Sequence, residues 1–170
     1  MKKKNIIFSV TLGIVLLLDQ ITKMYVSSIM FLHDSSPVID GFFSITYVRN
    51  PGAAFGFLAD SSSSFRSVFF VAIAIIAILL ILFLIMKAKD EELLFTLSLS
   101  LILGGAVGNL IDRVRFGEVI DFLDFYLASY HWPAFNVADT AISCGAVLLV
   151  FGMIKKKEKV RIPTLKGKES

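Results

Sequence analysis

One uninterrupted apolar stretch decides the class of fold: residues 67–86 read SVFFVAIAIIAILLILFLIM and contain no charged side chain. A helix of about 20 apolar residues crosses a bilayer core of about 30 Å, so this stretch is long enough to span a membrane. Residues 93–111 and 135–154 also qualify, the latter interrupted by Asn136 and Asp139. The sequence therefore predicts a polytopic membrane protein.

The composition agrees with a membrane protein and excludes several other classes of protein. Hydrophobic residues make up 56% of the 170 residues and charged residues 18%, which excludes an ordinary water-soluble globule. The length predicts a single domain, residues 1–170. The net charge of +3 is too small to indicate a nucleic-acid partner. A single cysteine excludes an internal disulfide or a Cys-rich metal site, and we expect no metal and no cofactor.

The first apolar segment has two interpretations. Residues 6–18 follow three lysines and are similar to the short apolar core of a secretory signal. However, apolar character resumes beyond Asp19 as far as Met30, and no Ala-x-Ala site is present there. Asp19 and Lys23 also lie one helical turn apart. We therefore predict a retained helix over residues 6–30, the first of four.

The positions of the basic residues predict the orientation. Twelve of the 17 Lys and Arg residues lie in the N-terminal segment, the 87–92 loop and the tail 155–170. Cytoplasmic segments of membrane proteins are enriched in these residues, so both termini and this basic tail are predicted to be cytoplasmic. Residues 31–64 and 112–134 would then be external. Residues 42–48 are rich in strand formers, which predicts a small β-containing segment between helices 1 and 2 and a loop between helices 3 and 4.

Polar residues concentrate near the external ends of the predicted helices. Ionisable side chains in membrane spans are costly and usually mark function. The residues concerned are Asp19, Lys23, Asn109, Asp112, Arg113, Asn136 and Asp139. The Asp19 and Lys23 pair is equally consistent with simple neutralisation, and Asp112 with Arg113 is equally consistent with interfacial anchoring. Asp139, a lone acid among apolar neighbours, favours a functional role, whereas the glycines at 104, 105 and 108 predict helix packing.

The motifs limit the chemistry to carboxylates. The sequence contains no His-Glu-x-x-His, no Gly-x-Ser-x-Gly and no P-loop. Two neighbouring carboxyl groups share a proton, so that one activates water while the other polarises a carbonyl. Asp121 and Asp139 are suitable for such peptide hydrolysis, with Asp112 and Asp124 as alternatives. A small transporter and an assembly factor packed through the glycine face are the competing classes.

Five blocks of sequence, in one order along residues 19–139, resemble lipoprotein signal peptidase, or signal peptidase II. They are DQ at 19–20 with Lys23, RNPGAAFG at 49–56, GNLIDR at 108–113, Gly117 with VIDF at 119–122, and PAFNVAD at 133–139. The resemblance implies a four-helix aspartyl endopeptidase of the bacterial cytoplasmic (inner) membrane, with its active site near the outer face. It implies catalytic roles for Asp121 and Asp139. The residues implied to support the site or the substrate are Asp19, Lys23, Asn50, Gly52, Asn109, Asp112, Arg113 and Asn136.

The same resemblance implies the substrate and the inhibitor. The substrate would be a bacterial prolipoprotein whose cysteine already carries diacylglyceryl, cut just before that cysteine. Membrane lipid would surround the enzyme, the family needs no metal, and globomycin, a cyclic peptide, is its familiar inhibitor. We expect a monomer.

Overall fold

The computed structural model of the protein describes residues 2–52 and 62–166. Four helices in this part of the chain are long and apolar enough to cross a membrane. They are α1 Lys3–Ile29, α2 Ser63–Lys87, α3 Leu93–Phe116 and α4 Val137–Lys166. The chain is therefore a mainly helical, multi-pass membrane protein, as the sequence predicted.

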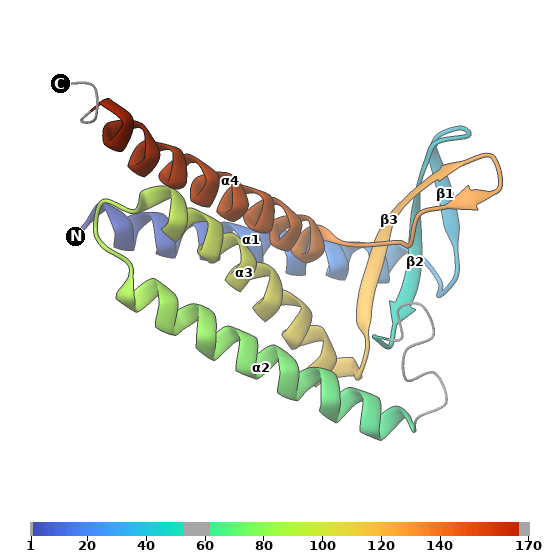
Figure 1. Ribbon diagram of the computed structural model, residues 1–170. Helices are drawn as coiled ribbons and strands as arrows, with labels where there is room; N and C mark the ends of the chain where they lie inside the picture. Colours follow the sequence, from blue (N-terminus) through green and yellow to red (C-terminus); the bar gives the residue numbers. More distant parts are fainter. Residues whose placement is uncertain (1, 53–61, 167–170) are drawn as a thin grey trace.

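A small antiparallel sheet lies at one end of the helices, which we call the sheet end (Figure 1). The opposite end, where α1 begins, α2 meets α3 and α4 finishes, is called the terminal end. The strands run in the order β1 Ser35–Ile39, β2 Phe43–Asn50, β3 Val119–Leu127 and β4 Tyr130–His131. The two halves of the chain meet in this sheet, because β2 pairs with β3.

The predicted loop over residues 112–134 is wrong in two respects. Residues 112–116 continue α3, which ends where Gly117 adopts a left-handed φ of 78°. Most of the remaining segment forms β3 and β4, so the sheet is not confined to the connection between α1 and α2. The partner of β3 is a strand about 70 residues earlier in the chain, and local sequence patterns do not reveal such pairing.

The other three helices also differ from their predicted bounds. α1 runs from Lys3 to Ile29 instead of over residues 6–30. α2 begins at Ser63 instead of residue 67, because the hydroxyl of Ser62 accepts a hydrogen bond from the backbone N–H of Phe65 and caps the helix. α4 begins at Val137 instead of residue 135 and continues through much of the predicted tail, to Lys166. The candidate membrane span within it is Val137–Lys156.

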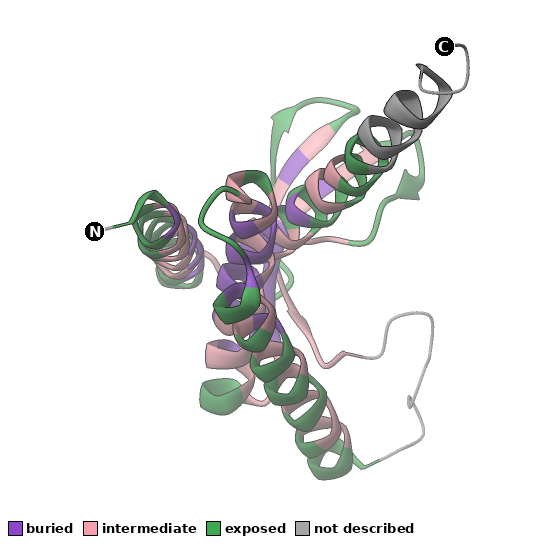
Figure 2. Ribbon diagram, turned by 60° about the vertical axis from the view of Figure 1, so that its left-hand side comes forward, coloured by how far each residue is buried: buried purple, intermediate pink, exposed green. Residues whose placement is uncertain are grey.

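α3 is the central helix, since it packs against α1, α2 and α4. Figure 2 shows buried residues gathered along α3, whereas α2 is largely exposed or half-buried. Glycines allow this close packing, as predicted: a Cβ on Gly105 would collide with the carbonyl oxygen of Ala138 on α4, and one on Gly108 would lie 2.5 Å from Asp19 Oδ2 on α1. The contact between α1 and α3 therefore brings a carboxylate against helix backbone.

The sheet is fixed to α1 by an apolar cluster. Val26 at the end of α1 packs with Tyr47 of β2 and with Ile120 and Phe122 of β3. All four side chains are buried. One face of β2 and β3 is therefore turned toward α1, and residues that alternate with these point to the other face.

Candidate active site

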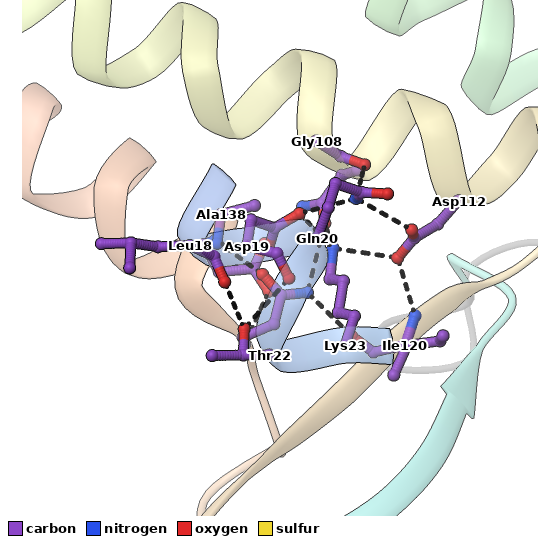
Figure 3. A network of polar contacts seen from close by, with 12 residues as sticks. Leu18, Asp19, Gln20, Thr22, Lys23, Gly108, Asp112, Ile120 and Ala138 are labelled. Atoms are coloured by element: carbon purple, nitrogen blue, oxygen red, sulfur yellow. Dashed lines mark hydrogen bonds and ion pairs between the residues drawn. The ribbon is translucent and has the colours of Figure 1, made fainter. Parts of the chain in front are cut away.

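A buried lysine forms the centre of a polar network at the sheet end (Figure 3). Lys23 Nζ lies 2.9 Å from Asp19 Oδ2 on the same helix and 2.9 Å from Asp112 Oδ2 on α3. It also donates a hydrogen bond of 2.9 Å to Asn109 Oδ1. All three charged residues are at most 1% exposed, so each ion depends on the others for compensation. The extension of α3 past residue 111 places Asp112 in this network.

The two carboxylates of the network also bind backbone of other elements. Asp19 Oδ1 accepts the N–H of Ala138 at 2.9 Å, which satisfies a free donor in the first turn of α4. Asp112 Oδ2 accepts the N–H of Ile120 at 3.2 Å and holds the start of β3. The network therefore connects α1, α3, α4 and the sheet.

Gln20 completes the network, although the sequence analysis did not propose it as a site residue. Its Nε2 atom lies 3.0 Å from Asp19 Oδ2, 3.3 Å from Asp112 Oδ1 and 3.3 Å from the carbonyl oxygen of Gly108. One feature of the sequence could have indicated this role: Gln20 is a polar residue inside an apolar span, and it directly follows Asp19.

Asn109 connects the lysine network to Asp139. Because Asn109 Oδ1 accepts from Lys23, its Nδ2 group is the donor, and it donates to Asp139 Oδ1 at 2.8 Å. Asn136 caps α4 reciprocally with Asp139: Asn136 Oδ1 accepts the N–H of Asp139 at 2.9 Å, and Asp139 Oδ2 accepts the N–H of Asn136 at 3.3 Å. Each carboxylate oxygen of Asp139 therefore accepts a hydrogen bond from an identified N–H donor.

Asp121 is held by two asparagines. Asn136 Nδ2 donates to Asp121 Oδ1 at 2.7 Å, and Asn50 Nδ2 donates to Asp121 Oδ2 at 2.9 Å. The N–H of Gly52 donates to Asn50 Oδ1 at 2.8 Å and sets the direction of that amide. Gly52 has a φ of 88°, a left-handed conformation that favours glycine. Asn136 thus bonds to both Asp121 and Asp139. The following residues of that sequence block, 53–56, lie outside the described residues.

Burial makes Asp121 a weaker acid than an ordinary aspartate. Its side chain is 1% exposed, and the loss of solvation raises the pKa of Asp121 to about 7 despite the hydrogen bonds from Asn50 and Asn136. The negative charge of Asp139 contributes to the same increase in the pKa of Asp121. Asp139 is half-buried and more accessible than Asp121. Two carboxyl groups that repel each other in this way can share one proton.

The other two acids considered from the sequence have different partners. Asp112 is bound to Lys23 and to the backbone of Ile120. Asp124 lies 3.0 Å from His131 Nδ1 on the hairpin that β3 and β4 form. Arg113 forms no ion pair closer than 4.0 Å with an acid of residues 2–52 or 62–156, and its guanidinium lies 5.6 Å from the ring centroid of Phe70 on α2. Among the described residues, no cluster of three His, Cys, Asp or Glu side chains is suited to a metal ion.

Comparison with known proteins decides the family. The family described as Signal peptidase (SPase) II matches residues 11–155. The chain is 59% identical over 159 residues to a lipoprotein signal peptidase of Syntrophus aciditrophicus, covering 94% of this chain and 99% of that protein. The chain belongs to the signal peptidase II family. A lipoprotein signal peptidase of Geobacter metallireducens is 50% identical, with 94% and 97% covered.

The fold is shared with a solved structure. A bacterial membrane enzyme determined by the in meso method at 2.3 Å is 35% identical to this chain, with a TM-score of 0.79 and coverage of 89% and 90%. Membership in the signal peptidase II family makes the chain a peptidase that removes signal peptides from prolipoproteins. The polar centre around Asp121 and Asp139 is the candidate active site for that reaction.

Proposed function

We propose that the chain is an aspartyl endopeptidase whose catalytic pair is Asp121 and Asp139. The proposal rests on Asn136, which bonds to both carboxyl groups and keeps them in one site. A pKa of about 7 for Asp121 supports a pair that holds one proton near neutral pH. The lysine network supplies rigid support through Asn109 and is not itself a reacting group.

The proposed reaction is a direct attack by water. The ionised carboxylate of the pair takes a proton from water, whose oxygen attacks the scissile carbonyl carbon, while the protonated carboxyl donates to the carbonyl oxygen. As the tetrahedral intermediate collapses, a hydroxyl proton of the diol returns to the second carboxylate and the C=O bond re-forms. The C–N bond breaks, and the new amine leaves with the proton that the first carboxylate had taken. Both carboxyl groups are needed, and no covalent enzyme intermediate forms.

The proposed substrate is a diacylglyceryl-modified bacterial prolipoprotein, cut immediately before the lipidated cysteine. Acyl chains hold such a substrate in the membrane, which confines its search for the site to two dimensions. The apolar faces that the helices leave exposed are suited to contact with the same lipid. We expect a globomycin-type cyclic peptide to compete for the site, and we expect the enzyme to act as a monomer without a cofactor.

The proposed location is the bacterial cytoplasmic (inner) membrane with both termini in the cytoplasm. The excess of lysines at the terminal end supports this orientation, since basic residues are enriched on the cytoplasmic side. The candidate site lies at the sheet end, far from the termini, and would therefore face the outer side of the membrane.

A cleavage assay on purified protein tests the proposal. Wild type, Asp121→Asn, Asp139→Asn and the matched control Asp124→Asn are incubated with a diacylglyceryl-modified prolipoprotein, and with the unlipidated precursor, and cleavage is followed by gel shift. We expect wild type and the control to cut the lipidated form, and both dyad variants to lose roughly a thousandfold or more in rate. A folded dyad variant with a near-normal rate would refute the assignment, and equal cutting of the unlipidated precursor would refute the substrate.

A further inference from the structure

Two arginines at the sheet end share one aromatic ring. The guanidinium carbon of Arg49 on β2 lies 4.4 Å from the ring centroid of Phe116, and that of Arg115 lies 5.1 Å from the same centroid. Arg49 Nε and Nη2 also donate to the hydroxyl of Tyr47, at 3.1 and 2.8 Å. Tyr47 is buried and packed in the apolar cluster against α1, so Arg49 is held in a fixed position.

The described side chains, those of residues 2–52 and 62–156, supply no counter-charge for this pair. Neither Arg49 nor Arg115 has a carboxylate within 4.0 Å in the part of the chain whose side chains are described, residues 2–52 and 62–156. Arg115 lies in the last turn of α3, where the helix dipole favours a cation, but Arg49 lies on a strand and has no such compensation. Two neighbouring cations on one ring form a site that an anion completes.

A hollow of about 140 Å³ adjoins the pair between α1 and α3. Arg115 and Phe116 line one side of it, and Met24 and Ser27 of α1 line the other. The other charged groups of its lining, Lys23 and Asp112, pair with each other, which leaves Arg115 as the unpaired charge of the lining. Arg49 does not line the hollow and adjoins it through the ring of Phe116. The hollow is therefore electrically suited to a small anionic group.

The position of the hollow indicates where that group comes from. Arg115 ends a membrane-spanning helix, at the depth where hydrocarbon gives way to lipid headgroups. On the same flank of α1, Leu17 and Met24 are 60% and 52% exposed, so an apolar seam leads from the hollow into the membrane. A phospholipid combines an anionic phosphate with acyl chains and matches both features.

We infer that Arg49 and Arg115 bind the phosphate of an anionic phospholipid, whose acyl chains lie along the seam between α1 and α3. Arg49 points away from the proposed catalytic carboxylates, because its side chain and that of Asn50, the next residue on the strand, lie on opposite faces of the sheet. The hollow itself borders the lysine network at Lys23 and Asp112. The orientation given under the proposed function would place this lipid in the outer leaflet, whereas the binding itself does not depend on peptidase activity.

Photo-crosslinking in lipid nanodiscs tests this inference. Wild type is reconstituted in phosphatidylcholine that contains a photoactivatable phosphatidylglycerol or, separately, a photoactivatable phosphatidylcholine, and labelled peptides are identified by mass spectrometry. We expect the anionic probe to label residues 112–120 preferentially, and we expect Arg115→Gln to lower this labelling about fivefold. Adding Arg49→Gln lowers it further, toward the level of the neutral probe.

The controls separate specific binding from general charge attraction. Lys3→Gln with Lys87→Gln removes two positive charges at the terminal end and should leave labelling of residues 112–120 unchanged. Arg115 is exposed, so the single variant keeps its fold, which the thermal unfolding midpoint verifies. Equal labelling by the two probes, unchanged labelling in Arg115→Gln, or an equal loss in the lysine control would overturn the inference. Full competition by excess inorganic phosphate would indicate a small-anion site and would overturn the lipid assignment.

Discussion

The two ends of the helical bundle use the same ion-pair chemistry in opposite environments. At the sheet end, Lys23 lies between two acids, and none of the three side chains is more than 2% exposed. At the terminal end, Lys2 pairs with Asp90 at 2.8 Å, but the two side chains are 68% and 46% exposed. The contacts are equally short, so only burial distinguishes them.

This difference in burial distinguishes ion pairs that hold a site in place from ion pairs that lie on the surface and contribute little to stability. Breaking a buried pair leaves an uncompensated charge and costs about 3–5 kcal/mol, whereas exposed pairs contribute about 0–1 kcal/mol. The buried group at the sheet end also continues through Asn109 to Asp139, so its geometry sets the position of a proposed catalytic carboxylate. The exposed pairs connect to nothing comparable.

Replacing the central lysine should produce the largest effect. Lys23→Met removes the cation and leaves Asp19 and Asp112 uncompensated, so we expect the free energy of unfolding to fall by about 3–5 kcal/mol. Cleavage should decline as well, because Asn109 loses the donor that fixes its amide. Unfolding in mixed micelles measures the first effect. A loss below about 1 kcal/mol would mean that the network is no more important than a surface pair.

The pH dependence of stability should reveal Asp121. Its pKa in the folded chain is about 7, above the ordinary value of 3.8, so the folded state binds the proton more tightly than the unfolded state. The stabilising contribution is complete below about pH 4 and is lost as the pH rises toward 7. Relative to Asp121→Asn, wild type should lose about 2–3 kcal/mol between pH 5 and pH 7, at about 1.4 kcal/mol per unit. Parallel stability curves for the two proteins would contradict this.

A methyl group between α1 and α3 should have an intermediate effect. Gly108→Ala places a Cβ 2.5 Å from Asp19 Oδ2, and the resulting displacement should cost about 1–3 kcal/mol in unfolding free energy. Gly13→Ala is the matched control, since a Cβ there meets no atom within 4 Å and alanine favours the helix. If both variants unfold alike, the close approach at Gly108 does not constrain the network.

The smallest effect is expected at the terminal end. Lys156 lies 2.9 Å from Glu92, with side chains 76% and 32% exposed. Lys156→Gln should change the unfolding free energy by less than about 1 kcal/mol and leave cleavage unaltered. Both variants are unfolded in the same micelles, so that the free energies lost at the two ends are compared directly. A loss in Lys156→Gln as large as that in Lys23→Met would remove the distinction between the two ends.

The sequence predicted what depends on local patterns. The apolar run over residues 67–86 predicts a spanning helix by its length alone, and Asp19 and Lys23 were predicted to be neighbours because they are one turn apart. The structure confirms that pair at 2.9 Å. Asn136 and Asp139, both identified as polar residues within the fourth apolar stretch, form a reciprocal cap.

Contacts between distant segments could not be predicted in this way. The pairing of β2 with β3 sets Asn50 beside Asp121, and nothing in residues 119–127 identifies that partner. The same limit applies to Gln20, whose partner Asp112 lies 92 residues later. Without the sheet, residues 112–134 looked like a loop, although the blocks that resemble signal peptidase II marked the residues concerned.

The bond between Asp19 and the N–H of Ala138 has a consequence for biosynthesis. It joins α1 to α4 across 119 positions of the chain, so the carboxylate of Asp19 has no partner at Ala138 until the segment between them has been translated. Asp139 arrives one residue after Ala138, within the same turn that Asp19 caps. Asp139 and its anchoring point are therefore synthesised together, and a nascent chain that ends before them lacks one carboxylate of the proposed catalytic pair.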